Sequence, residues 1–570
     1  MRRLLIATIP AVLLIAGAHV LLAEEGMWTF DNFPMVRANQ TLGTNIDHSW
    51  LDRVRLSSVR ISGCSAGLVS PDGLILTNNH CVSTCIANLS TPTRKYADTG
   101  FIPARRDDEQ KCQGQVAEIL ASISDVTDRM RAAGANLSGQ AFTAARDAEA
   151  GRIESEACGS DASRRCAVVS LYRGGQFKLY VYRIYNDVRL AFAPEDRVAN
   201  FGGDPDNFNF PRFAVDAAFL RLYEKNRPAS TPTYFRWNAA APKAGEPVFV
   251  SGSPGATQRL LTQDQLATVR DVILPFEQLI ASVLRGRLLQ FGAQSAASAF
   301  IVMDPLSTVE NNYKRLLGRM RALVDAEFMG RRSREESEFR KRVAGDPGLS
   351  KRVGDPWADL VAVQGKQRES YPAYTLLETR AGGGSALFGW AMTLVRAAQE
   401  RAKPSDQRLP EFADSRLAAM QARLLAERPV YRALDQLQVE WWLSKTREWL
   451  TVDDARVGAL LGKESPEAIA ARLMTKTTLD DVATRRALWQ GGIAAVQASA
   501  DPLIRYVLGI EMTTRAVRRE WEETVAGPTD RAAERLADAR FAVYGDTVYP
   551  DATGTLRLTY GKIEGSSVPG

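Results

Sequence analysis

One histidine of this sequence stands in a setting suited to proton transfer. His80 lies near the end of the segment GCSAGLVSPDGLILTNNHCV, in which a Pro-Asp-Gly turn separates two short apolar runs typical of a β-hairpin. Cys64 and Cys81 would lie on its adjacent strands, and a disulfide between them would hold the turn that carries His80. Since an imidazole can take up and release a proton near neutral pH, His80 is the candidate general base. Of the other two histidines, His19 lies in the N-terminal apolar run and His48 precedes the first apolar runs of the expected barrel.

A general base of this kind needs a carboxylate that fixes its tautomer and stabilises its protonated form. Asp216 stands at the start of the apolar run AAFLRLY, and an acid beside such a run is costly unless it is paired. Asp204 and Asp206 lie in a Gly- and Pro-rich loop, where turn formation is the more typical role. We therefore assign the orienting role to Asp216, in the order His then Asp that chymotrypsin-like proteases use.

All six cysteines lie in the first third of the chain, an even number that predicts disulfides in an exported protein. Cys158 and Cys166 bracket a short polar loop and are expected to close a hairpin. The pairing of the remaining two is left open: Cys85 and Cys112. An alternative is a metal site of His80, Cys81 and Cys85, but three histidines in the whole chain and an oxidising compartment argue against it. These residues imply no metal and no cofactor.

The N-terminus has the pattern of a secretory signal. Arg2 and Arg3 precede an apolar run from Leu4 to Leu22, and the small residue Ala23 follows. We expect a signal peptide over 1–23 and a periplasmic or secreted protein that leaves the membrane after cleavage. An uncleaved anchor is the alternative, because a run of about 20 apolar residues could span a bilayer.

Composition indicates a globular protein of several domains. The chain has 570 residues, of which 45% are hydrophobic, and its net charge of +6 is the difference between 72 basic and 66 acidic residues. The charges are spread along the chain, so they give no footprint for nucleic acid.

The pattern changes twice along the chain and predicts an α+β multidomain protein. Short apolar runs broken by Gly, Pro, Asn and Asp indicate a β-rich domain over 24–261, with a helical insertion at about 115–156. Apolar residues at three- and four-residue spacing then predict a helical domain over 262–540. The last stretch, 541–570, returns to strand-like alternation.

Six motifs together identify the chain as a member of the dipeptidyl-peptidase 7 and 11 family of bacterial serine exopeptidases. They are EGMWTFDNFP, SGCSAGLVSPDGLILTNNHCV, FGGDPDNFNFPRF, VFVSGSPGATQR, NNYKRLLG and VYPDATGTLRLTYG. The resemblance implies a chymotrypsin-like double β-barrel with a large α-helical domain inserted within the second barrel, where it caps the cleft. It also implies a homodimer that releases dipeptides from oligopeptides with a free N-terminus.

The resemblance also implies residues that hold the substrate ammonium group. By their place in the motifs, these are Asn207, Phe208 and Asn311. Amide oxygens and a ring face can both receive an ammonium group. Turn formation and helix capping are the alternatives for the two asparagines.

The sequence departs from the family pattern at two points. Asn79 replaces the first of two histidines that many relatives carry, which leaves His80 in place. The nucleophile motif Gly-Asn-Ser-Gly-Ser-Pro of the family does not occur, and the nearest match places Ser253 in a loop of a different segment. We therefore expect that the chain stops before the nucleophilic serine and leaves the second barrel incomplete. The side-chain preference of the primary pocket depends on that same stretch.

Two other functions are compatible with these patterns. One is a catalytically inactive relative that binds peptides or a partner protein through the helical domain. The other is a chymotrypsin-like endopeptidase, which would cleave N-terminally blocked peptides.

Overall fold

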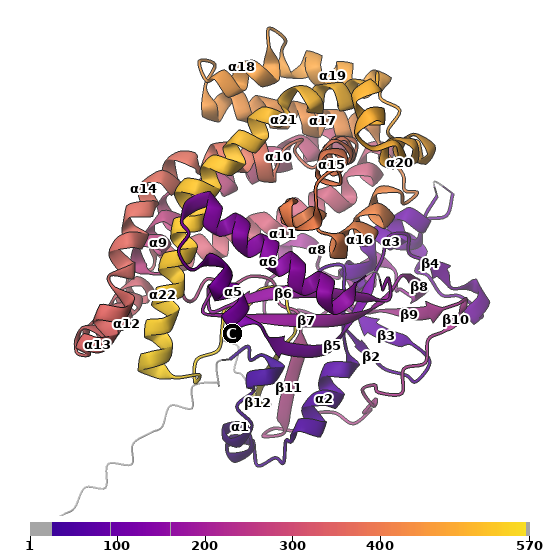
Figure 1. Cartoon of the computed structure of the whole chain (residues 1–570). Helices are drawn as coiled ribbons and strands as arrows, with labels where there is room; N and C mark the ends of the chain where they lie inside the picture. The colour runs from indigo at the N-terminus through magenta and orange to yellow at the C-terminus, as the bar shows by residue number, and fades with distance from the viewer. Residues whose placement is uncertain (1–25, 92, 160, 566–570) are drawn as a thin grey trace, which may run out of the picture.

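The computed structural model describes residues 26–565 except 92 and 160 (Figure 1). The predicted signal peptide, 1–23, lies outside the described residues. None of the helices among the described residues has both the length and the apolar character needed to cross a membrane.

Twelve strands are present in the part of the chain that the structure describes, and they form two antiparallel sheets. The larger sheet has the order β4-β8-β9-β3-β2-β1-β5-β7-β6, with β10 paired to β9, and β11 pairs with β12 in the smaller one. Their bounds are β1 Ser58–Ile61, β2 Cys64–Leu68, β3 Leu74–Thr77, β4 Gln110–Lys111, β5 Ala117–Asp125, β6 Arg164–Leu171, β7 Gln176–Tyr185, β8 Asp187–Phe192, β9 Ala218–Glu224, β10 Arg227–Pro228, β11 Pro247–Gly252 and β12 Arg557–Lys562.

The larger sheet bends around a shared apolar core. Val188 of β8 and Ile119 of β5 belong to one buried cluster, although β9, β3, β2 and β1 separate the two strands in the sheet. Leu68 and Ile75, on the hairpin strands β2 and β3, are buried in the same cluster. The sheet thus holds the hairpin that carries His80 on one side of a packed core, whereas closure into a double barrel stays a prediction.

The predicted helical insertion begins later than the sequence pattern indicated. Residues 117–125 form strand β5, which pairs with β1 and β7, and only the following residues form helices α5 (Thr127–Gly134) and α6 (Gly139–Cys158). Ile119 and Leu120 are both buried, each in a different apolar cluster. Pairing with two neighbours outweighs the local spacing, because strand formation depends on tertiary contacts.

The remaining N-terminal helices are short. Their bounds are α1 Met35–Leu42, α2 His48–Ser57, α3 Ser83–Leu89, α4 Tyr96–Thr99, α7 Asp196–Ala199 and α8 Gly203–Asp206. The helix α6 is longer and lies between the sheet and the C-terminal helices (Figure 1).

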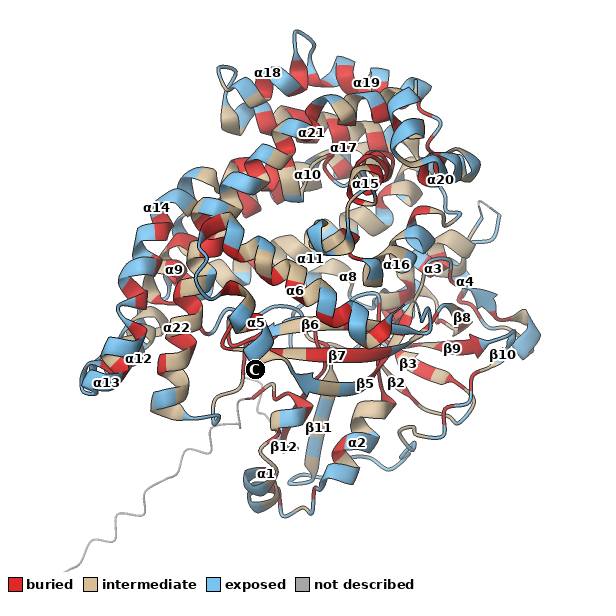
Figure 2. Ribbon diagram, in the orientation of Figure 1, coloured by how far each residue is buried: buried red, intermediate tan, exposed pale blue. Residues whose placement is uncertain are grey.

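The region that the sequence assigns to 262–540 is helical, and its last helix continues to Tyr544. Its helices are α9 Gln263–Thr268, α10 Leu274–Gly292, α11 Ala296–Val324, α12 Ala326–Ala344, α13 Pro347–Val353, α14 Pro356–Tyr374, α15 Ala386–Glu400, α16 Asp414–Leu424, α17 Arg432–Leu450, α18 Ala455–Leu461, α19 Pro466–Lys476, α20 Val482–Ala498, α21 Pro502–Trp521 and α22 Gly527–Tyr544. Buried positions of α15, α17 and α21 face one another and build the largest apolar cluster (Figure 2).

Local sequence signals set several of these helix ends. Asp346, Asp355 and Asp501 each accept a hydrogen bond from a backbone N–H of the first turn, and each is followed by proline. This combination satisfies free donors and presets the first helical φ. Gly492 has φ 58° and kinks α20.

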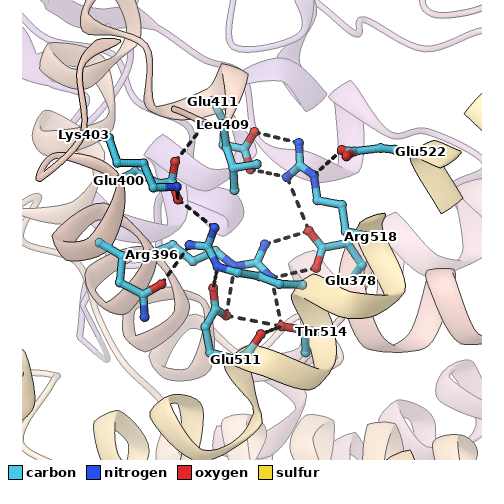
Figure 3. A network of polar contacts seen from close by, with 12 residues as sticks. Glu378, Arg396, Glu400, Lys403, Leu409, Glu411, Glu511, Thr514, Arg518 and Glu522 are labelled. Carbon is cyan, nitrogen blue, oxygen red and sulfur yellow. Dashed lines mark hydrogen bonds and ion pairs between the residues drawn. The ribbon is translucent and has the colours of Figure 1, made fainter. Parts of the chain in front are cut away.

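Buried ion pairs tie α15 to α21 (Figure 3). The guanidinium group of Arg396 lies 2.6 Å from Glu378 and 3.2 Å from Glu511. Arg518 continues the network to two further carboxylates, Glu411 and Glu522. Arg396 is shared by two carboxylates and Arg518 by three, Glu378 being common to both, which compensates for part of their lost hydration.

Candidate active site

The structure brings His80 and Asp216 together. Nδ1 of His80 lies 2.7 Å from Oδ2 of Asp216, and the backbone N–H of His80 donates to Oδ1 of the same carboxylate at 3.0 Å. The histidine side chain is 68% exposed and the aspartate side chain 25%. The carboxylate therefore fixes the ring from one edge and leaves the other nitrogen, Nε2, open to solvent.

The surroundings of Asp216 favour its charged form. Burial works against the charge, but the hydrogen bonds from the side chain and backbone of His80 outweigh it and lower the pKa of Asp216 below its ordinary value. The side-chain amide of Asn78 also donates to Oδ2 of Asp216 at 3.2 Å and to its carbonyl at 3.0 Å. Asp216 is therefore ionised at neutral pH, as a residue that orients an imidazole must be.

Covalent bonds hold the turn on which His80 lies. Cys64 of β2 is bonded to Cys81, the residue after His80, with 6.1 Å between their Cα atoms. A further disulfide joins Cys85 of α3 to Cys112, so the chain that follows the turn is fixed as well. The third disulfide among the described residues joins Cys158 to Cys166 and closes the loop before β6. Three disulfides fit an oxidising compartment.

These disulfides contradict the alternative metal site of His80, Cys81 and Cys85, because both sulfurs are bonded to other cysteines. Within the described residues, one group has ligand atoms close enough for a metal, namely Cys64, His80 and Cys81. Its two sulfurs form one disulfide, which offers no thiolate.

A cavity of about 390 Å³ opens beside the histidine. One wall comes from the sheet region and carries His80, Asp216 and Asn207, while α11 supplies the opposite wall with Asn311. The side-chain amide of Asn207 donates to Oδ1 of Asn311 at 3.2 Å across the cavity. Its size lies in the range of small-ligand sites.

The third residue expected to hold the ammonium group is placed differently. Phe208 has φ 72°, a region rarely adopted by residues other than glycine, and the residue is 63% exposed. It does not line the cavity that Asn207 and Asn311 share. The structure therefore brings the two asparagines together and leaves Phe208 beside them on the surface.

Sequence reasoning missed the side chains that support Asn207. The guanidinium group of Arg212 donates to Oδ1 of Asn207 at 3.1 Å and to Oδ1 of Asn200 at 2.9 Å. Arg212 lies in the quoted motif FGGDPDNFNFPRF, so its closeness to Asn207 in sequence was the available signal. Asp304 of α11 also lines the cavity, but no sequence motif marked it.

No serine hydroxyl of the described residues lies within hydrogen-bonding distance of the His80 ring. Ser253, the nearest match to the nucleophile motif, is buried, and its backbone N–H donates to Oγ of Ser65 at 2.7 Å. It does not line the cavity beside His80.

Comparisons with known proteins show the family and the fold of the chain. The chain is 28% identical to the Asp/Glu-specific dipeptidyl-peptidase of Shewanella putrefaciens, over 98% of this chain and 78% of that protein. It is 26% identical to dipeptidyl-peptidase 7 of Porphyromonas gingivalis, over 67% of this chain and 56% of that protein. The crystal structure of Porphyromonas endodontalis DPP11 in complex with the dipeptide Arg-Glu matches 95% of this chain and 80% of that chain, with TM-score 0.73 and 20% identity. The family model described as peptidase S46 matches residues 23–570, and the chain therefore belongs to the peptidase S46 family.

Proposed function

We propose that this protein is a serine-type dipeptidyl aminopeptidase that releases dipeptides from the free N-termini of oligopeptides. The observation that carries the proposal is the pairing of His80 with Asp216 at the edge of a cavity whose far wall holds Asn311. The names of the relatives support the same reaction class, since they are dipeptidyl-peptidases.

His80 acts as the general base in this proposal. With Nδ1–H donating to Asp216, the lone pair of Nε2 is free to accept the proton of a serine hydroxyl as its oxygen attacks the peptide carbonyl. The imidazolium that forms then donates the proton to the leaving amine. Water repeats the sequence on the acyl-enzyme and frees the dipeptide. Asp216 stays ionised throughout and stabilises the imidazolium.

The two asparagines bind the other end of the substrate. An ammonium group needs acceptors, and the carboxamide oxygens of Asn207 and Asn311 are neutral acceptors inside the cavity. Recognition of a charged N-terminus at a fixed distance from His80 would limit cleavage to the second peptide bond. We propose a role for Phe208 at the rim of this subsite.

The serine nucleophile is the member of the triad that the described residues do not place at His80. Sequencing the gene beyond the codon for Gly570 tests this directly: a reading frame that continues into a Gly-x-Ser-Gly segment supports the proposal. A stop codon directly after Gly570 would refute it.

A hydrolysis assay tests the specificity. The full product of the gene should release dipeptides from fluorogenic dipeptidyl substrates with a free amino group and should leave N-acetylated forms intact. Cleavage of the acetylated forms at equal rates would instead indicate the endopeptidase.

A second candidate is a peptide-binding relative without catalysis, which is compatible with a His80 ring that no serine of the described residues contacts. Such a protein should bind peptides and unfold in one cooperative transition as the 570-residue chain. Exposed apolar surface and aggregation of the purified chain would argue against it. We further propose export to the periplasm or the medium and assembly as a homodimer, the latter by analogy with the family.

A further inference from the structure

One face of α11 makes polar contacts with the β-rich region at both ends of the cavity. Asp304 accepts hydrogen bonds from the hydroxyl groups of Ser83 at 3.2 Å and Thr84 at 3.3 Å, just after the His80 turn. Further along the helix, Asn311 accepts the amide hydrogen bond from Asn207. The first contact lies beside the general base, and the second lies in the proposed ammonium subsite.

The third contact is an ion pair one turn beyond Asn311. The ammonium group of Lys314 lies 2.9 Å from Oδ1 of Asp204 and also donates to the backbone carbonyl of Asp204. That carbonyl also accepts the backbone N–H of Asn207 at 3.1 Å. Lys314 therefore contacts the group that sets the backbone position of Asn207. Asp204, which the sequence favoured as a turn former, has this second role in the structure.

The helix can make all three contacts because of its periodicity. Residues 304, 311 and 314 are separated by seven and three positions, a spacing that places them on the same side of a helix. At 1.5 Å per residue, the ten positions from Asp304 to Lys314 span about 15 Å. The contacts therefore lie on either side of the cavity rather than at one point, and α11 lies beside α8 (Figure 1).

The most deeply buried apolar residues of α11 pack largely within the helical domain. They are Val302, Leu316 and Leu323, and the latter two belong to a cluster with residues of α9 and α10. The polar contacts of Asp304, Asn311 and Lys314 instead join α11 to the β-rich region.

We propose that Lys314 and Asp304 are positioning residues that dock α11 on the β-rich region and thereby hold Asn311 against Asn207 at a fixed distance from His80. The inference rests on the proposed function, in which that asparagine pair receives the substrate ammonium group. Lys314 and Asp304 do not touch the reacting atoms. They set the length of the cavity, and thus the register in which a peptide lies.

A charge exchange tests the Lys314 contact in the 570-residue chain. The probe is the dipeptide Arg-Glu, measured by titration calorimetry, with N-acetyl-Arg-Glu as the comparison. Lys314→Asp and Asp204→Lys should each weaken Arg-Glu binding by at least about fivefold, because each places like charges in contact. The double variant restores the ion pair and should return affinity to within about twofold of the wild type.

Hydrogen exchange provides an independent reading of the docking. Amides of 203–207 and of α11 should exchange faster in both single variants and return to wild-type rates in the double variant. Lys341→Asp, which reverses an exposed charge on α12, is the matched control and should change neither measurement. Asp304→Ala and the pair Ser83→Ala with Thr84→Ala should loosen α11 to the same extent, since they remove opposite sides of one contact.

The outcomes separate this inference from the proposed function. The positioning role would be overturned if Lys314→Asp showed wild-type hydrogen-exchange rates. It would also be overturned if the double variant recovered neither the Arg-Glu affinity nor the exchange rates of the wild type. If the wild-type chain binds Arg-Glu no better than the acetylated form, the proposed ammonium subsite is wrong. In that case the hydrogen-exchange rates alone test whether Lys314 holds α11 on the β-rich region.

Discussion

Oδ2 of Asp216 lies 2.7 Å from Nδ1 of His80, although 136 positions separate the two residues in the chain. The strand β9 begins two residues after Asp216 and pairs with β3, which ends three residues before His80. The pairing of these two strands is therefore what brings the carboxylate and the imidazole to the same edge of the sheet.

Replacement of that carboxylate should abolish most turnover. In the full gene product, Asp216→Asn should lower kcat by about a thousandfold or more, because the neutral amide neither fixes the reactive tautomer nor stabilises the imidazolium. Turnover of a dipeptidyl fluorogenic substrate measures the effect. Asp196→Asn, which changes another carboxylate lining the cavity, is the control. A comparable loss in both variants would show that the cavity charge, not the contact with His80, matters.

Removal of the disulfide beside His80 should loosen the site as well as the fold. The pair Cys64→Ser and Cys81→Ser opens a loop of 17 residues, which should cost about 3 kcal/mol and speed exchange of amides around residue 80. Calorimetry and hydrogen exchange measure the two effects. The matched control opens the other hairpin disulfide, Cys158 with Cys166, and should lower stability while exchange around residue 80 stays slow. Slow exchange in the first variant would contradict the role given to this bond.

The contact between Arg212 and Asn207 predicts a loss of peptide affinity. Arg212→Ala removes a charged donor from the carboxamide of Asn207, and dipeptide binding should weaken about tenfold, the value of one such hydrogen bond. Titration calorimetry with Arg-Glu measures it. Arg197→Ala, an exposed arginine of α7, should leave affinity unchanged. Unchanged affinity in the Arg212 variant would show that Asn207 holds its position without help.

Asp147 of α6 should make the stability of the protein depend on pH. Burial, followed by the negative charge of Glu522, raises the pKa of Asp147 to about 7. Glu411 adds to this effect, whereas the two nearby arginines, Arg416 and Arg518, oppose it and are themselves bonded to other carboxylates. The folded protein thus binds this proton more tightly than the unfolded chain does, whose ordinary value is 3.8.

The sign of that effect is fixed. Stability from Asp147 is greatest below pH 4 and is lost as the pH rises to about 7, where the folded protein releases the proton. Asp147→Asn should therefore raise Tm at pH 8, where the free energy of unfolding should increase by about 2 kcal/mol. At pH 4 the substitution should change Tm little. Asp128→Asn, the same substitution at an exposed aspartate of α5, is the control. Equal stabilisation at both pH values would contradict the titration.

Local pattern predicted the His80 hairpin well because its turn, its apolar runs and its cysteines lie within twenty residues. Asp216 could be chosen because an acid beside an apolar run needs a partner. The strand at 117–125 was misassigned, since its two neighbours come from β1 and β7 and leave no mark on its own spacing. Asp304 and Lys314 were missed for the same reason: their partners lie 221 and 110 positions away.

The hydrogen bond between the carboxamides of Asn207 and Asn311 has a consequence for selectivity. Oδ1 of Asn207 already accepts from Arg212 and Oδ1 of Asn311 already accepts from Asn207, so each of these oxygens keeps one further lone pair. In the proposed binding mode, a charged amine with three donors can reach both oxygens at once, whereas a blocked terminus with one donor can reach only one. The proposed discrimination against blocked peptides would then follow from the number of donors at the peptide's end.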